Sequence, residues 1–208
     1  MPVFISYALV VAIWSTTPMG IKLSNDSISS EAAVLLRMIL ASVFMLLFIA
    51  CFKRNVWLKK ANIPIYIVAS IGLFPNMAVV YKAASYISSG MISVLFALTP
   101  IISGVMAAVV LKNEPISLRK MIAMLLAIAG VVLVFSDQMA VEGEAIKGIL
   151  WMLLSGFLFS ASQVGVKYCQ RDHVVDASEQ TLGALLFSLP GLLLSWCVFD
   201  GTIPQTIS

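Results

Sequence analysis

Apolar and polar positions follow each other in long blocks along the chain rather than residue by residue. Seven apolar runs are separated by short polar connectors, and they cover residues 3–21, 32–52, 63–81, 91–111, 121–135, 149–166 and 182–199. A helix that crosses the hydrocarbon core of a bilayer needs about 20 apolar residues, and flanking residues extend the shorter runs toward that length. A transmembrane β-barrel would instead show alternation within segments of about ten residues. The pattern therefore predicts seven transmembrane helices.

The composition supports a membrane location for the whole chain. Of 208 residues, 61% are hydrophobic and only 11% are charged, and the mean hydropathy is +1.02. The hydrophobic share is above and the charged share is below that of ordinary soluble domains, which predicts an all-α integral membrane protein, a multi-helix transmembrane bundle. The first run lacks a basic leader and a small-residue cleavage site before Lys22, so we expect a retained helix rather than a signal peptide. Three cysteines without metal-ligand spacing predict neither a disulfide framework nor a metal site, and we expect no cofactor.

The distribution of basic residues predicts the orientation, because cytoplasmic connectors are enriched in Lys and Arg. The connectors after the second, fourth and sixth runs hold nine basic residues, whereas the alternate connectors hold three, with Arg37 set aside as intramembrane. We expect a multi-pass plasma-membrane protein with a cytoplasmic N-terminus. The nine residues are Lys53, Arg54, Lys59, Lys60, Lys112, Arg119, Lys120, Lys167 and Arg171.

Two segments far apart in the chain resemble each other. "IWSTTPMGIK" at 13–22 aligns without a gap with "LFSASQVGVK" at 158–167, an offset of 145 residues. Trp14 meets Phe159, and Lys22 meets Lys167. Five predicted helices separate the two starts, so the second copy crosses the membrane in the opposite direction. This is an inverted-topology repeat, an architecture common among secondary transporters.

The repeat also sets an expected length. Residues 1–140 make a first five-helix repeat, and residues 141–208 make a partial second repeat of two helices. Two full copies would need about 290 residues and ten helices. The predicted fold is therefore a five-helix inverted repeat whose second copy is incomplete, with seven of an expected ten helices. We interpret the sequence as truncated or as a fragment, unless the missing helices come from elsewhere.

Several motifs, taken in order, resemble the drug/metabolite transporter superfamily of EamA type. "WSTTPMGIK" is similar to that family's first-helix motif, and "LLRMILA" is similar to its arginine motif at Arg37. "SSGMISVLFALTPIISGVMAAVVLKNEPISLRKMIAMLLAIAGVVLVF" resembles its fourth and fifth helices, with Pro100, Glu114 and Gly130 at matching positions. Ser15 departs from the glycine often found there. The resemblance implies a ten-helix transporter of two repeats in a bacterial inner membrane, and many members export amino acids, metabolites or drugs.

Polar and helix-breaking residues inside the apolar runs are the candidate solute pathway. Pro18 cannot donate a backbone hydrogen bond, so we expect a kink near Trp14 and a carbonyl whose partner is a hydroxyl or cavity water. Interrupted segments at matching positions of two repeats indicate a substrate site. Single hydroxyls could instead join packed helices, and Asn76 faces either the cavity or a neighbouring helix. The candidates are Trp14, Ser15, Thr17, Pro18, Asn76, Thr99, Pro100, Ser160, Ser162 and Gln163.

Five charged residues lie within the runs or at their ends: Lys22, Arg37, Lys82, Glu114 and Lys167. Arg37 lies six residues after Glu31, about 9 Å along a helix, and so below the outer interface. It could extend toward that interface, bind helix-end carbonyls or meet an anionic solute group. For Glu114 an ion pair at the helix end is favoured over proton coupling.

The function predicted from these features is secondary active transport or export of small metabolites by alternating access. The alternatives are a non-functional truncated fragment or a structural membrane subunit and, less favoured, an integral-membrane enzyme. The single histidine and the absence of paired aspartates, a Gly-x-Ser-x-Gly motif and a glycine-rich phosphate loop argue against the enzyme. The expected partners are the lipid bilayer and a small solute, with a proton, a counter-solute or a second copy of the chain left open, and no nucleic acid.

Overall fold

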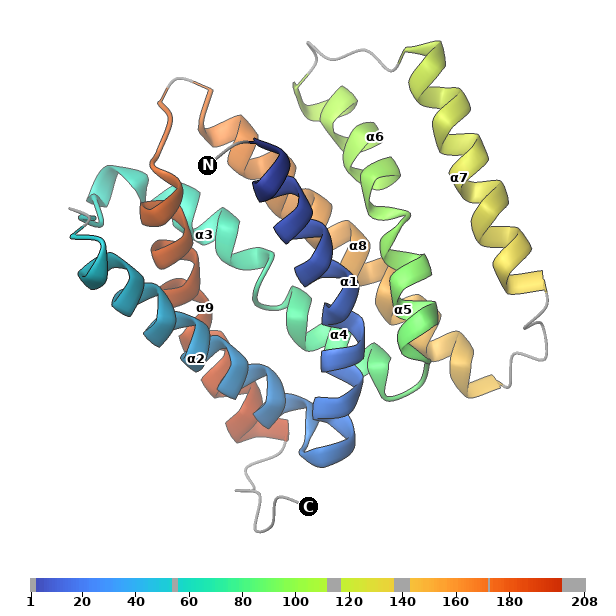
Figure 1. Cartoon of the computed structure of the whole chain (residues 1–208), viewed down its shortest axis with the longest axis horizontal. Coiled ribbons are helices and arrows are strands. Elements are labelled where there is room, and N and C mark those ends of the chain that lie inside the picture. Colours follow the sequence, from blue (N-terminus) through green and yellow to red (C-terminus); the bar gives the residue numbers. More distant parts are fainter. Residues whose placement is uncertain (1–2, 54–55, 112–116, 137–142, 172, 200–208) are drawn as a thin grey trace.

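The computed structural model describes residues 3–53, 56–111, 117–136, 143–171 and 173–199. Throughout these residues every regular element is a helix, and the helices form a bundle (Figure 1). In chain order they are α1 (Val3–Ser27), α2 (Ser30–Cys51), η1 (Lys60–Asn62), α3 (Ile63–Ile71), α4 (Asn76–Ala84), α5 (Ser89–Phe96), α6 (Thr99–Leu111), α7 (Leu118–Ser136), α8 (Gly143–Cys169) and α9 (Ala177–Phe199).

Six helical stretches are long and apolar enough to cross a membrane. They are Val3–Ser27, Ser30–Cys51, Lys60–Ala84, Ser89–Leu111, Gly143–Cys169 and Ala177–Phe199. The seventh predicted run, 121–135, lies inside α7, whose apolar stretch Met121–Gly130 is shorter than these six. Large apolar side chains cover the outer faces of the helices, as a lipid environment requires. The predicted class, a helical membrane bundle, is confirmed.

Two of the six spans are interrupted. The third consists of η1, α3 and α4 with a break at 72–75, and the fourth consists of α5 and α6 with a break at 97–98. Pro75 directly precedes α4 and Pro100 lies in the first turn of α6, where a missing backbone N–H is tolerated. The interruption beside Pro100 agrees with its place among the helix-breaking residues of the candidate pathway. In contrast, α1 continues through Pro18 as one helix.

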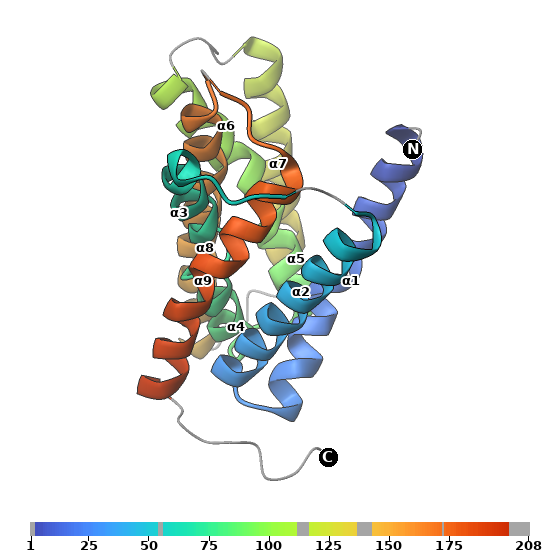
Figure 2. The ribbon, with the colours of Figure 1, turned by 90° about the vertical axis from the view of Figure 1, so that its left-hand side faces the viewer.

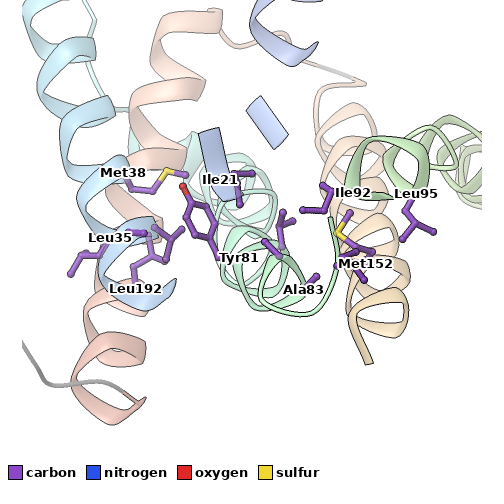
Figure 3. Packing of buried hydrophobic residues seen from close by; sticks show 14 of the residues in the cluster. Ile21, Leu35, Met38, Tyr81, Ala83, Ile92, Leu95, Met152 and Leu192 are labelled. Atoms are coloured by element: carbon purple, nitrogen blue, oxygen red, sulfur yellow. The ribbon is translucent and has the colours of Figure 1, made fainter. Parts of the chain in front are cut away.

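Helix α8 is at the centre of the packing. It contacts α3, α4, α5 and α6, while α9 packs on α2 and α3 (Figure 2). The main buried cluster joins side chains of α1, α2, α4, α5, α8 and α9, and Figure 3 shows Tyr81 between Met38 of α2 and Ile21 of α1. A Cβ atom added at Gly191 of α9 would overlap the ring of Phe74, so the close approach of these segments depends on that glycine.

The two ends of the bundle differ in charge. One end, called here the basic end, carries residues 56–60, the last turns of α6 and α8, and the first turns of α3 and α9 (Figure 1). The other end carries the α1–α2 connection and the last turn of α4. The charge count predicts that the basic end is cytoplasmic.

Candidate functional site

A cavity of about 530 Å³ lies among α1, α5, α6 and α8, next to the break in the fourth span. We call it the hydroxyl cavity because four hydroxyl-bearing residues and three aromatic residues contribute to its wall. Among the described residues, none that lines it is charged. Its lining residues are Trp14, Ser15, Pro18, Ser93, Phe96, Ala97, Thr99, Pro100, Ser103 and Phe159. Five of the ten predicted pathway residues therefore meet at one cavity.

The hydroxyl of Thr99 is the unusual group in this wall. Thr99 is 7% exposed, and its Oγ1 atom is buried without a hydrogen-bond partner among the described residues. Two other buried side-chain atoms share this condition, Asn25 Oδ1 and Trp196 Nε1, but neither residue lines the hydroxyl cavity. Buried polar groups are nearly always paired, because an unpaired one costs about 1–3 kcal/mol. A polar group of a solute, or water, would satisfy Thr99.

The remaining hydroxyls near Thr99 are already paired. Ser103 donates to Ser160 Oγ over 2.8 Å, and the Ser160 hydroxyl lies 3.4 Å from the carbonyl oxygen of Thr99. Ser160 is fully buried, so it supports the wall from behind. On α1 the hydroxyl of Ser15 donates to the carbonyl of Ala12 over 3.0 Å. A hydrogen bond of this kind, from a hydroxyl to a carbonyl of the preceding turn, is the usual way for a helix to satisfy a hydroxyl in an apolar environment.

Trp14 and Phe159 contact each other across the cavity wall. Their ring centroids are 5.9 Å apart and the rings are inclined by 68°, an edge-to-face arrangement. These are the residues that occupy the same position in the two aligned segments. The contact thus brings matching points of α1 and α8 together.

Two other predicted pathway residues lie in helix contacts instead. Asn76 is fully buried, accepts a hydrogen bond from Ser155 Oγ over 2.7 Å and donates to the carbonyl of Gly72 over 3.0 Å. Ser162 is 2% exposed and donates to the carbonyl of Ala69 over 3.3 Å. Of the two alternatives for Asn76, the structure places it against a neighbouring helix.

Gln163 and Lys167 line a second space, a groove of about 590 Å³ between α6 and α8. Gln170 also lines this groove, and it lies toward the basic end of the bundle. Ser103 belongs to both linings, so the groove adjoins the hydroxyl cavity. The two spaces together extend from the break in the fourth span toward the basic end.

Thr17 and Arg37 line a third space of about 590 Å³ on the other side of α1. The hydroxyl of Thr17 donates to the carbonyl of Ile13 over 2.8 Å, and Arg37 Nη1 lies 3.5 Å from the hydroxyl of Tyr81. Arg37 also borders a larger, mainly apolar groove of about 780 Å³ between α2 and α9. Within α1, Trp14, Ser15 and Pro18 therefore line the hydroxyl cavity, whereas Thr17 lines this third space.

The other predicted charged residues have separate places. Lys22 donates to the carbonyl of Ala84 over 2.8 Å at the end of α4, where a cation complements the helix dipole. Lys82 is exposed, and Glu114 lies outside the described residues. Among the described residues, no group of three or more His, Cys, Asp or Glu side chains could hold a metal ion.

Sequence reasoning missed Ser103 and Phe96 as lining residues. Ser103 is four residues after Thr99, which is one helical turn, so it shares the face of α6 that Thr99 presents. Phe96 ends α5 directly before the break. A search for residues one turn from each predicted interruption would have found both.

The fold and the site define a class of protein: a multi-pass helical membrane protein with an interrupted span beside a cavity lined by hydroxyl-bearing and aromatic residues. Residues 2–136 match the model of the EamA-like transporter family, so the chain belongs to that family. No curated protein and no solved structure matches the chain. The family is one of membrane transporters of small molecules rather than enzymes, which agrees with the resemblance in the sequence.

Proposed function

We propose that this chain is a secondary active transporter that moves small solutes across the plasma membrane by alternating access, with the hydroxyl cavity as its solute site. The unpaired hydroxyl of Thr99 carries the proposal. Thr99 lines the hydroxyl cavity, and pairing of its buried hydroxyl with a solute there would recover the cost of leaving that group unpaired.

The arrangement of α1 and α8 supports the transport mechanism. Residues at the axis of a two-fold repeat contact their own equivalents, and Trp14 contacts Phe159. In transporters built from inverted repeats, solute sites lie at the repeat interface beside discontinuous helices. The break at 97–98 borders the hydroxyl cavity in this way. One repeat moving against the other would expose such a site to each side in turn.

The lining of the cavity favours a particular solute chemistry. Three aromatic residues, Trp14, Phe96 and Phe159, supply apolar surface, and hydroxyls supply the hydrogen bonds. A charged group would lose its hydration here without an opposite charge in the described wall. The site therefore suits an uncharged, partly apolar part of a solute that carries one or two hydrogen-bonding groups.

Transport by the purified full chain in proteoliposomes tests the proposal. The vesicles are loaded with a mixture of the standard amino acids, nucleosides and quaternary-ammonium dyes, and efflux is followed by mass spectrometry. Thr99→Val keeps the shape of the side chain and removes its hydroxyl, so at least one solute should lose about tenfold or more in efflux rate, equivalent to about 1.4 kcal/mol.

Thr181→Val is the matched control. Thr181 is exposed on α9, its hydroxyl donates to its own helix at Ala177 over 2.8 Å, and it does not line the hydroxyl cavity. Its efflux should equal that of the parent chain. Equal efflux from both threonine variants, or no carrier-dependent efflux of any solute, would refute the assignment.

A further inference from the structure

A buried carboxylate at the basic end of the bundle lies outside the hydroxyl cavity lining. Glu179, in the first turn of α9, is 7% exposed, and it is the only charged side chain classed as buried among the described residues. No described cation lies within ion-pair distance of it. A buried carboxylate is costly unless its partners compensate for the lost hydration, so the groups that bind Glu179 matter.

Neutral donors surround this carboxylate. Asn62 Nδ2 donates to Glu179 Oε1 over 2.7 Å, the hydroxyl of Tyr66 donates to the same oxygen, and the backbone N–H of Lys59 lies 3.5 Å from it. The N–H of Lys59 also donates to the Tyr66 hydroxyl over 3.1 Å. Asn62 is 2% exposed and Tyr66 is 1% exposed, so the donors are held in place.

The donors belong to a different part of the chain from the acceptor. Asn62 and Tyr66 begin the third span, whereas Glu179 begins the sixth, more than 110 residues later. The three hydrogen bonds therefore tie the first turn of α9 to the start of α3. Hydrogen bonds to an ionised acceptor are roughly twice as strong as neutral ones, so the strength of this tie depends on the charge of Glu179.

We propose that Glu179 is a proton-binding site, and that its anion acts as a latch that holds the starts of α3 and α9 together until it takes up a proton. The proton comes from water beside the exposed segment 57–60 and adds to the carboxylate, and no other bond is made or broken. The neutral acid remains a weaker acceptor for the same donors, so the two helix ends separate more readily. In transport, the latch would control the opening of the basic end, and this role rests on the proposed function.

Other titratable groups lie on the elements around the latch, and the test must distinguish their protonation from that of Glu179. His173 is an exposed imidazole in the segment before α9. Lys59 before η1 and Tyr66 of α3 contact Glu179 directly, and Asp176 precedes α9. Cys169 of α8 packs on the cluster that contains Tyr66, and Cys51 of α2 lines a groove together with Thr181 of α9.

A distance measurement across the latch tests the proposal without any transport assay. Nitroxide labels are placed on cysteines at Lys60 and Ala177, which are both exposed, in a full chain whose native cysteines are replaced by serine and which is held in lipid nanodiscs. Double electron–electron resonance then gives the distance distribution at a series of pH values. The parent should show a short, narrow distribution at neutral pH that lengthens and broadens as the pH falls.

The variants distinguish Glu179 from its neighbours. Glu179→Gln presents a neutral oxygen of the same shape, so its distribution should be long at every pH. His173→Asn should respond to pH as the parent does. Glu144→Gln, at an exposed carboxylate that pairs with Lys147 over 2.6 Å, is the matched acidic control and should also respond normally.

Three results would overturn the proposal: a parent distribution that does not change with pH, a normal pH response in Glu179→Gln, or loss of the response in His173→Asn. If Glu179→Gln does not fold, Tyr66→Phe decides, because it removes one donor and keeps the ring. Its distribution at neutral pH should lie between the parent's neutral and acidic distributions. A Tyr66→Phe distribution identical to the parent's would also overturn the latch. Because these measurements need no solute, their failure is separate from a failure of the transport proposal.

Discussion

The pair formed by Asn76 and Ser155 offers a direct test of whether a polar residue in this bundle stabilises the fold or contacts the solute. Asn76 begins α4 and Ser155 lies in α8, and both are fully buried. Ser155 Oγ donates to Asn76 Oδ1 over 2.7 Å, and Asn76 Nδ2 donates to the carbonyl of Gly72 at the break before α4. We expect this asparagine to act through stability.

The structure sets the size of the expected effect. Ser155→Ala leaves Asn76 Oδ1 without the donor seen here, a loss worth about 1–3 kcal/mol in soluble proteins. Comparable pairs in a membrane protein average roughly 0.6 kcal/mol and reach about 1.7, so we expect about 1 kcal/mol. Asn76→Ala removes both hydrogen bonds and some packing, and should cost about 2 kcal/mol. The double variant should then show a coupling energy of about 1 kcal/mol.

Equilibrium unfolding in mixed micelles with increasing dodecyl sulfate measures these free energies. Ser42→Ala is the matched control, because the Ser42 hydroxyl donates to its own helix at Met38 over 2.8 Å and is also buried. Its coupling to Asn76→Ala should be near zero. A coupling below about 0.3 kcal/mol for Asn76 and Ser155 would refute the pairing as a stabilising contact. If Asn76→Ala lost solute efflux without losing stability, Asn76 would act in the solute pathway rather than through stability.

Two further predictions concern packing and orientation. Gly191→Ala should destabilise the fold by about 1–3 kcal/mol in the same unfolding assay, because its Cβ would overlap the Phe74 ring. Gly20→Ala, which meets open space on α1, should be neutral or stabilising by up to about 1 kcal/mol, and equal effects of the two would contradict the packing argument. Cysteines placed at Lys60 and Lys147, both exposed and at opposite ends of the bundle, should react differently with a membrane-impermeant maleimide on intact cells. Only Lys147→Cys should be labelled, and the reverse pattern would contradict the charge count.

The bundle was predictable because run length is a strong signal in a membrane. A lipid environment requires about 20 apolar residues to span it as a helix, and six predicted runs coincide with six such stretches. The break at 97–98 was also indicated, since Pro100 lies beside it. Which helices contact each other was not predictable. The pairing of α9 with α3, for example, depends on Gly183 meeting Tyr66, and nothing local in the sequence links these two residues.

The candidate site was predictable in part. Aligning the two segments placed Trp14 with Phe159, and the structure brings these rings into contact. The alignment could not separate Ser160 from Ser162, which were both assigned to the pathway. Two residues along a helix correspond to a rotation of about 200°, so these hydroxyls point in nearly opposite directions. Ser160 accepts a hydrogen bond from Ser103 of the hydroxyl cavity wall, whereas Ser162 donates one to the carbonyl of Ala69 in α3. Only the placement of the neighbouring helices decides which of them can reach a solute.

Glu179 shows why a charged residue can escape a sequence search. The same dipeptide, Ser-Glu, occupies the first turns of both α2 and α9, at Glu31 and Glu179. In either place a carboxylate complements the helix dipole, so the sequence suggests two ordinary helix starts. The structure separates them: Glu31 is half-buried, while Glu179 is buried against Asn62 and Tyr66. The same local chemistry therefore acquires two environments from residues more than 110 positions away. If the charge of Glu179 governs the basic end, this long-range contact adds a proton-sensitive function that the dipeptide alone does not encode.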